Sequence, residues 1–185
     1  MNIAIACSTN DLDQKYVQPA KKLAQLVGKG GHTIVWGASD FGLMKVLGDG
    51  VRQSGGKLLG ISTELFKAHA RKDVDEMIVA KNTSERKAIM LEKSDALIVT
   101  VGGLGTVDEV ADMLELKKQS YHNKPVVILN SAGFYDGLKM QLERMADEGF
   151  LPTGEREGIK VRSLSQFVRF ADTPEEAMAI LGTTS

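Results

Sequence analysis

The sequence predicts an α/β fold in which a mainly parallel central sheet is flanked by helices on both faces, giving a three-layer sandwich. Short apolar runs recur along the chain, and they are continuously apolar rather than alternating, which is typical of strands buried on both faces. Amphipathic segments follow these runs, with apolar residues at helical spacing. Strands that alternate with helices in this way favour a parallel sheet joined by right-handed crossovers.

The predicted elements follow one another in a regular order. We expect strands at residues 2–7, 32–37, 57–62, 76–80, 96–101, 125–130 and 167–172. We expect helices at residues 16–27, 42–56, 84–93, 106–119, 134–148 and 173–181. The last helix is opened by Thr173, with Pro174 at its first position. Residues 62–74 and 152–163 are the least regular stretches, but no linker or repeat divides residues 1–185, so a single domain is predicted.

The composition excludes several classes of function. The chain has 185 residues, of which 43% are hydrophobic and 25% charged, as in globular proteins with a sizeable core. Its net charge is −1, and the basic residues are interleaved with acids. This pattern offers no basic surface for nucleic acid or anionic membrane, so neither is expected as a partner.

The cysteine and histidine content argues against an internal disulfide and against a metal site. Cys7 is the single cysteine, so an internal disulfide is excluded, and its apolar neighbours favour a small buried side chain over a reactive thiol. His32, His69 and His122 are far apart in the sequence and lack metal-ligand spacing, so no metal site is expected. The first apolar run is too short for a signal peptide or a membrane span, and we expect a cytoplasmic protein.

The loops that follow the predicted strands are the places to look for a site. In a parallel sheet, ligands bind outside the carboxyl ends of the strands. The relevant loops come after Cys7, Trp36, Ala80 and Val101. The last of these contains the stretch TVGGLGTVDEV at residues 100–110.

This glycine-rich stretch has two interpretations. Residues 102–105 form a turn between strand and helix, and the backbone N–H groups of such a turn are suited to holding a phosphate at the start of the helix. Alternatively, Thr106 and Glu109 form a capping box that merely opens the helix. The pattern is neither G-x-G-x-x-G nor a Walker A loop, and both interpretations fit the local sequence.

A second element favours the phosphate interpretation. Arg86 and Lys87 lie near the start of the predicted helix at residues 84–93, where cations oppose the helix dipole. This helix leads into the strand that ends at the glycine turn. We therefore expect Arg86 to face Glu109 across an anion pocket.

These residues resemble the Lonely Guy (LOG) family of cytokinin riboside 5′-monophosphate phosphoribohydrolases, often labelled lysine decarboxylases. The stretch ERKAIMLEKSDALIVTVGGLGTVDEV is similar to the family's M-x-x-R-K and P-G-G-x-G-T-x-x-E pair. FGLMKVLGDGVRQSGGKLLGI and NKPVVILNSAGFYDGLKMQLERMADEGFL resemble two further family segments, and the likeness covers residues 2–182. The chain departs from the pattern at Val101, where the family has proline, and in the loop GASDFGLMK at residues 37–45, which has lost glycines.

The resemblance implies a Rossmann-like fold, a homodimer, and hydrolysis of the N-glycosidic bond of a nucleoside 5′-monophosphate to free base and ribose 5-phosphate, without a cofactor. AMP or a cytokinin riboside monophosphate is the implied type of substrate. Arg86 and Glu109 would be the catalytic pair. The implied phosphate- and substrate-binding residues are Gly102, Gly103, Gly105, Thr106, Ser8 and Lys87. The alternative is a non-catalytic carrier of a phosphate-bearing ligand, similar to molybdenum-cofactor carrier proteins, in which the altered 37–45 loop signals a changed ligand.

Overall fold

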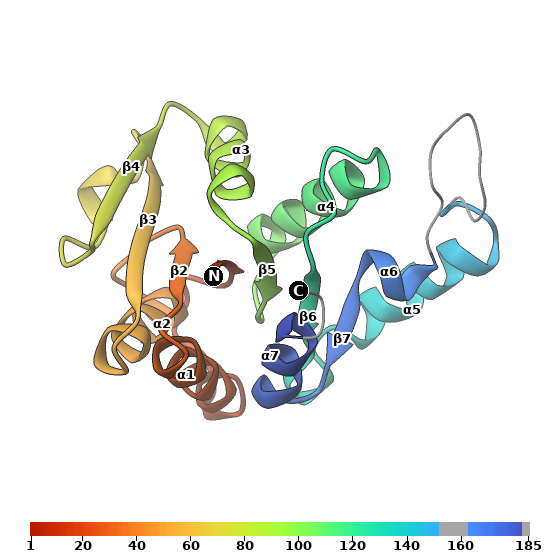
Figure 1. Ribbon diagram of the computed structural model, residues 1–185, viewed down its shortest axis with the longest axis horizontal. Coiled ribbons are helices and arrows are strands. Elements are labelled where there is room, and N and C mark those ends of the chain that lie inside the picture. Colours follow the sequence, from red (N-terminus) through yellow and green to blue (C-terminus); the bar gives the residue numbers. More distant parts are fainter. Residues whose placement is uncertain (152–162, 183–185) are drawn as a thin grey trace.

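The computed structural model describes residues 1–151 and 163–182. Within these residues the chain forms one sheet of seven parallel strands (Figure 1). The strands are β1 (Asn2–Ala6), β2 (Thr33–Trp36), β3 (Lys57–Thr63), β4 (Glu76–Ala80), β5 (Ala96–Val99), β6 (Val126–Leu129) and β7 (Arg169–Ala171). Their order across the sheet is β4-β3-β2-β1-β5-β6-β7, and every pairing is parallel.

Helices cover both faces of the sheet. One layer consists of α1 (Gln14–Lys29), α2 (Gly42–Gln53) and α7 (Pro174–Gly182), whose apolar side chains share one core cluster. The other layer consists of α3 (Thr83–Lys93), α4 (Leu104–Lys118), α5 (Asp136–Asp147) and the short α6 (Leu164–Phe167), which pack into a second cluster. Two 3-10 turns, η1 (Lys67–His69) and η2 (Ser131–Gly133), lie in the loops.

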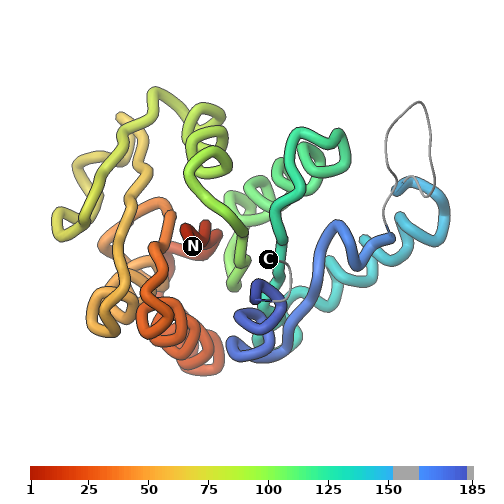
Figure 2. Tube along the Cα trace, viewed as in Figure 1, coloured from red at the N-terminus to blue at the C-terminus, as the bar shows by residue number. Residues whose placement is uncertain are grey.

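The two ends of the described chain meet in the first layer. Helices α1 and α7 are far apart in the sequence but lie side by side (Figure 2), and Lys22 pairs with Glu175 at 3.2 Å between them. The strand residues divide between the layers, because Ile3 and Ile5 belong to one cluster while Ala4 and Ala6 belong to the other. This two-sided burial explains why the strands are continuously apolar in the sequence.

The predicted α/β three-layer fold is confirmed. Each predicted strand and helix has a counterpart, but α4 begins at Leu104 rather than at Thr106, and α6 was not predicted. Most of the irregular stretch at 152–163 lies outside the described residues. Across the described helices, none has the length and hydropathy that crossing a membrane requires.

The strand order places a crevice at one point of the sheet. From β1 the chain builds outward through β2, β3 and β4, and after α3 it returns to place β5 on the other side of β1. The loops after β1 and β5 therefore diverge to opposite faces. The carboxyl edge between these two strands is the topological switch point, where ligands bind in sheets of this kind.

Candidate active site

The loops after β1 and β5 are joined at the switch point by backbone hydrogen bonds. Ser8 N–H donates to the carbonyl of Val101 at 3.0 Å, and Thr100 N–H donates to the carbonyl of Ala6 at 2.9 Å. These bonds extend the parallel pairing of β1 and β5 beyond the strands. They hold the glycine turn in a fixed position above the edge of the sheet.

The glycine turn is shorter than predicted. Gly103, with φ −91° and ψ −153°, is the N-cap of α4, so Leu104 and Gly105 already belong to the helix. The Gly103 carbonyl accepts from the N–H groups of Thr106 at 3.0 Å and Val107 at 3.1 Å. The first-turn N–H groups, including those of Leu104 and Gly105, have no acceptor within a helix and are available to an anion.

The capping-box interpretation of Thr106 and Glu109 is wrong. Thr106 lies inside α4, and no side chain caps this helix. The physical reason is that Gly103 takes the extended cap conformation, which moves the helix start toward the turn, so that Thr106 is the third helical residue rather than the N-cap and Glu109 lies in the second turn. Glu109 bonds to an arginine instead.

Close packing inside the turn requires glycine at position 102. A Cβ added to Gly102 would lie 2.0 Å from Oγ1 of Thr106, which is buried beneath it. By contrast, a Cβ on Gly103 or Gly105 would meet no atom within 4 Å. The turn is therefore packed on its inner side and open on its outer side, where backbone N–H groups can approach a ligand.

Arg86 and Glu109 form an ion pair beside this turn. Nη2 of Arg86 lies 2.7 Å from Oε1 of Glu109, and the side chains are only 16% and 12% exposed. Asn82 fixes the start of α3 by accepting from Glu85 N–H at 2.9 Å, and its carbonyl accepts from Arg86 N–H at 3.0 Å. Arg86 faces Glu109 as expected, but the two side chains are in direct contact rather than separated by an anion pocket.

Burial changes the protonation of this site. Removal from water raises the pKa of Glu109, the positive charge of Arg86 opposes this rise, and the net direction is upward. Burial and the neighbouring Glu109 also raise the pKa of the Cys7 thiol, which is therefore neutral. The prediction that Cys7 is a small buried side chain is confirmed. A carboxyl group with a raised pKa beside a cation is suited to acid–base or charge-stabilising chemistry.

A cavity of about 550 Å³ adjoins the ion pair. It lies over the carboxyl ends of β2 and β3, and Arg86 is one of its lining residues. Aromatic and apolar side chains also line it, namely Phe41 at the N-cap of α2, Met44 within α2, and Phe66 and His69 from the stretch between β3 and β4. Sequence reasoning missed these residues, because the irregular stretch that holds Phe66 and His69 carries no local motif.

Ser8 and Lys87 occupy different surroundings. Ser8 lies in the switch-point loop, and its Oγ accepts from Asn10 N–H at 3.0 Å. Nζ of Lys87 pairs with Asp108 at 3.0 Å and Asp112 at 3.4 Å, which links α3 to α4. These carboxylates raise the pKa of Lys87 although burial lowers it. The two assignments as substrate ligands stay predictions.

Tyr135 is a further residue of the site that was not singled out from the sequence. Its hydroxyl donates to the carbonyl of Thr100 at 2.8 Å, directly before the glycine turn. Asn130 accepts from Tyr135 N–H at 2.7 Å and donates to Asp136 at 2.7 Å, which fixes the start of α5. The segment GFY at 133–135, which contributes to the family resemblance, was the available signal.

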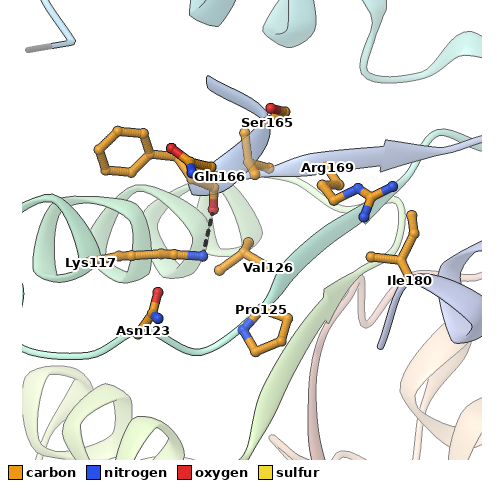
Figure 3. A pocket seen from close by; sticks show the side chains of 10 residues that line it. Lys117, Asn123, Pro125, Val126, Ser165, Gln166, Arg169 and Ile180 are labelled. Atoms are coloured by element: carbon orange, nitrogen blue, oxygen red, sulfur yellow. Dashed lines mark hydrogen bonds between the residues drawn. The ribbon is translucent and has the colours of Figure 1, made fainter. Parts of the chain in front are cut away.

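Another cavity, of about 420 Å³, lies at the opposite edge of the sheet, near the amino ends of β6 and β7 (Figure 3). Lys117 reaches into it from α4, and its Nζ donates to the carbonyls of Lys124 at 2.9 Å and Phe167 at 3.1 Å. This lysine ties α4 to α6 and to the loop before β6. No group of three or more metal-ligating side chains occurs in the portion of the chain that the structure describes.

The chain is similar to several known proteins. A family model described as possible lysine decarboxylase matches residues 44–181. A cytokinin riboside 5′-monophosphate phosphoribohydrolase of Mycobacterium tuberculosis is 30% identical over 170 residues, covering 90% of this chain and 91% of the relative. One of the same name from Rhodococcoides fascians is 33% identical over 150 residues, covering 80% and 76%.

Solved structures share the fold. The molybdenum cofactor binding protein of Rippkaea orientalis has a TM-score of 0.73 at 24% identity, covering 99% of this chain and 96% of that one. The molybdenum cofactor carrier protein of Chlamydomonas reinhardtii has a TM-score of 0.71 at 22% identity, covering 98% and 95%. At these identities the likeness establishes the Rossmann-like architecture alone. The family match and the curated relatives go further, and by them the chain belongs to the LOG family, whose model carries the description possible lysine decarboxylase.

Proposed function

We propose that the protein hydrolyses the N-glycosidic bond of a nucleoside 5′-monophosphate, of the AMP or cytokinin riboside monophosphate type, to free base and ribose 5-phosphate. The observation that carries the proposal is the nearly buried Arg86–Glu109 pair beside the open start of α4. The names of the curated relatives support the same reaction.

The glycine turn would hold the 5′-phosphate. Gly102 and Gly103 present the backbone on the outer side of the turn, and α4 adds its first N–H groups and partial positive charge. A chain with a net charge of −1 can bind an anion in this way without a basic surface. Phosphate binding at the turn would align the scissile bond with Glu109.

Glu109 would act on the ribose. Cleavage of a glycosidic bond passes through an oxocarbenium-like state, which a carboxylate stabilises. The same carboxylate orients a water molecule and accepts a proton from it as the water oxygen bonds to the anomeric carbon and the bond to the base breaks. The departing base takes up one proton, which balances the proton that the carboxylate accepted and then releases. Arg86 would hold Glu109 in place and bind ribose or phosphate oxygens.

A panel of nucleoside 5′-monophosphates, assayed for free base and ribose 5-phosphate, tests the proposal. Glu109→Gln should abolish turnover while nucleotide binding, measured by calorimetry, is largely retained. Glu115→Gln is the matched control, because Glu115 is exposed on the same helix and pairs with Lys118 and Gln119 one turn along. Turnover by Glu109→Gln at the wild-type rate would contradict the assignment. Binding of nucleotides by the wild type without any turnover would favour the carrier alternative.

We also propose that the protein is a homodimer and that it acts in the cytoplasm. The dimer rests on the family likeness. The cytoplasmic assignment is supported by Cys7, a free buried thiol of the kind that a reducing compartment maintains. Light scattering coupled to size exclusion would measure the mass in solution against the 20.0 kDa of one chain.

A further inference from the structure

The cavity beside the ion pair continues the site rather than forming a separate one. We propose that it receives the leaving base of the nucleotide, and that Phe41, Phe66 and His69 select which base is accepted. The inference rests on the proposed function, since it assigns a place to one product of that reaction. It concerns residues in the loop at 37–45, which departs from the family pattern, and in the irregular stretch at 62–74.

Arg86 connects the cavity to the reacting carboxylate. Its Nη2 pairs with Glu109, whereas its buried Nε has no hydrogen-bond partner among the described residues. The guanidinium also lies against the end of β2, because a Cβ on Gly37 would be 2.9 Å from Nη2. One side chain thus spans from the carboxylate to the cavity wall. A ribose placed at Glu109 would have its base directed over Arg86 into the cavity.

The chemistry of the lining suits a flat heteroaromatic ring. Phe41, Phe66 and His69 provide ring faces, on which nucleobases stack. The arginine of the lining is already paired with Glu109, which disfavours a second phosphate as occupant. The hydroxyls of Thr9, Ser39, Ser62 and Thr63 can both donate and accept, so they can satisfy the edges of several bases.

The aromatic wall is held together by backbone contacts between its two loops. Ser39 and Ala70 form an antiparallel bridge, and Arg71 N–H donates to the carbonyl of Ala38 at 2.7 Å. The rings of Phe41 and His69 meet edge to face, with centroids 6.1 Å apart. The cavity wall is therefore formed before ligand binding, which favours selection by shape.

Two of the wall residues expose apolar surface that a ligand would cover. Phe41 and Phe66 are 56% and 57% exposed, although both line the cavity. A purine has a larger stacking face than a pyrimidine, and a cavity of about 550 Å³ admits it with room for a substituent. The expected order of kcat/KM is therefore AMP and GMP above CMP and UMP.

The test compares Phe66→Ala and His69→Ala with Leu65→Ala. Leu65 is adjacent to Phe66 and 78% exposed, and it does not line the cavity, so it is the matched control. Phe66→Ala should lower kcat/KM for AMP on the order of tenfold, as loss of one stacking partner does. It should lower kcat/KM for CMP less, and leave the Kd of ribose 5-phosphate unchanged. Leu65→Ala should leave all three unchanged, and Phe66→Tyr should restore AMP turnover.

The outcomes separate this inference from the proposed function. If the wild type hydrolyses AMP but Phe66→Ala and His69→Ala behave like Leu65→Ala, the base lies elsewhere and the hydrolase assignment stands. If the wild type hydrolyses no nucleotide, the hydrolase assignment fails, and the cavity is tested by binding alone. AMP should then bind more tightly than ribose 5-phosphate, and Phe66→Ala should remove that difference. Equal affinity of the wild type for the two compounds would overturn the inference.

Discussion

Nη2 of Arg86 lies 2.7 Å from Oε1 of Glu109, although the two residues are 23 positions apart in the sequence. Arg86 lies near the start of α3 and Glu109 in the first half of α4, and both helices pack on the same face of the sheet. Each helix begins at the carboxyl edge, and the side chain of Arg86 bridges from α3 to α4 there. A nearly buried pair of this kind is costly to break on one side only, because the remaining charge is left without a partner.

The pH dependence of the proposed reaction follows from the raised pKa of Glu109. The ionised carboxylate is the active form, so activity is present above this pKa and is lost as the pH falls through it. Because burial raises the pKa above the ordinary value of 4.5, the acid limb of kcat/KM should lie above pH 4.5. A kcat/KM profile for AMP between pH 4 and 9 would measure it. An acid limb below the ordinary value would contradict the assigned role.

Arg86→Gln should move this acid limb to still higher pH. The arginine opposes the effect of burial, so its removal leaves burial unbalanced and raises the pKa of Glu109 further. Lys87→Gln is the comparison variant. Lys87 also lowers the pKa of Glu109, but its effect is smaller than that of Arg86. Its profile should shift in the same direction by a smaller amount. A larger shift for Lys87→Gln than for Arg86→Gln would show that the two cations have been assigned wrongly.

Gly102→Ala should destabilise the protein, whereas Gly105→Ala should not. The new Cβ at position 102 would overlap Thr106, at a cost of about 1–3 kcal/mol for overpacking. At position 105 the Cβ meets no atom within 4 Å, and alanine in place of a helical glycine contributes roughly 0.5–1 kcal/mol. Urea unfolding of both variants would measure these changes. Equal stability of the two would mean that the turn is not packed as described.

Tyr135→Phe should weaken substrate binding more than it slows chemistry. The lost hydroxyl leaves the buried carbonyl of Thr100 without its 2.8 Å donor, which costs about 1 kcal/mol and loosens the start of the glycine turn. KM for the nucleotide should rise several-fold while kcat changes little. A purely structural role would lower the melting temperature without changing KM, so the two measurements together decide whether Tyr135 positions the turn.

The chain of strands and helices was predictable because it depends on local patterns. Continuous apolar runs marked strands buried on both faces, and helical spacing marked the helices that cover them. The start of α4 was misplaced because Gly103 adopts an extended cap conformation, which a glycine-rich stretch permits at several positions. Thr106 and Glu109 matched a capping box in sequence, yet the tertiary partner Arg86 determined where Glu109 points.

The sequence alone therefore determined the fold class, the edge of the sheet that carries the site, and the identity of Arg86, Glu109 and the glycine turn as its candidates. Only the tertiary structure decided that Glu109 contacts Arg86 directly, that Tyr135 supports the turn, and that an aromatic cavity adjoins the pair. The physical reason is that strand and helix formation follow from periodicity along the chain. The contacts of a site depend on which loops the sheet order brings together, and on how burial then changes the charge of the groups that meet there.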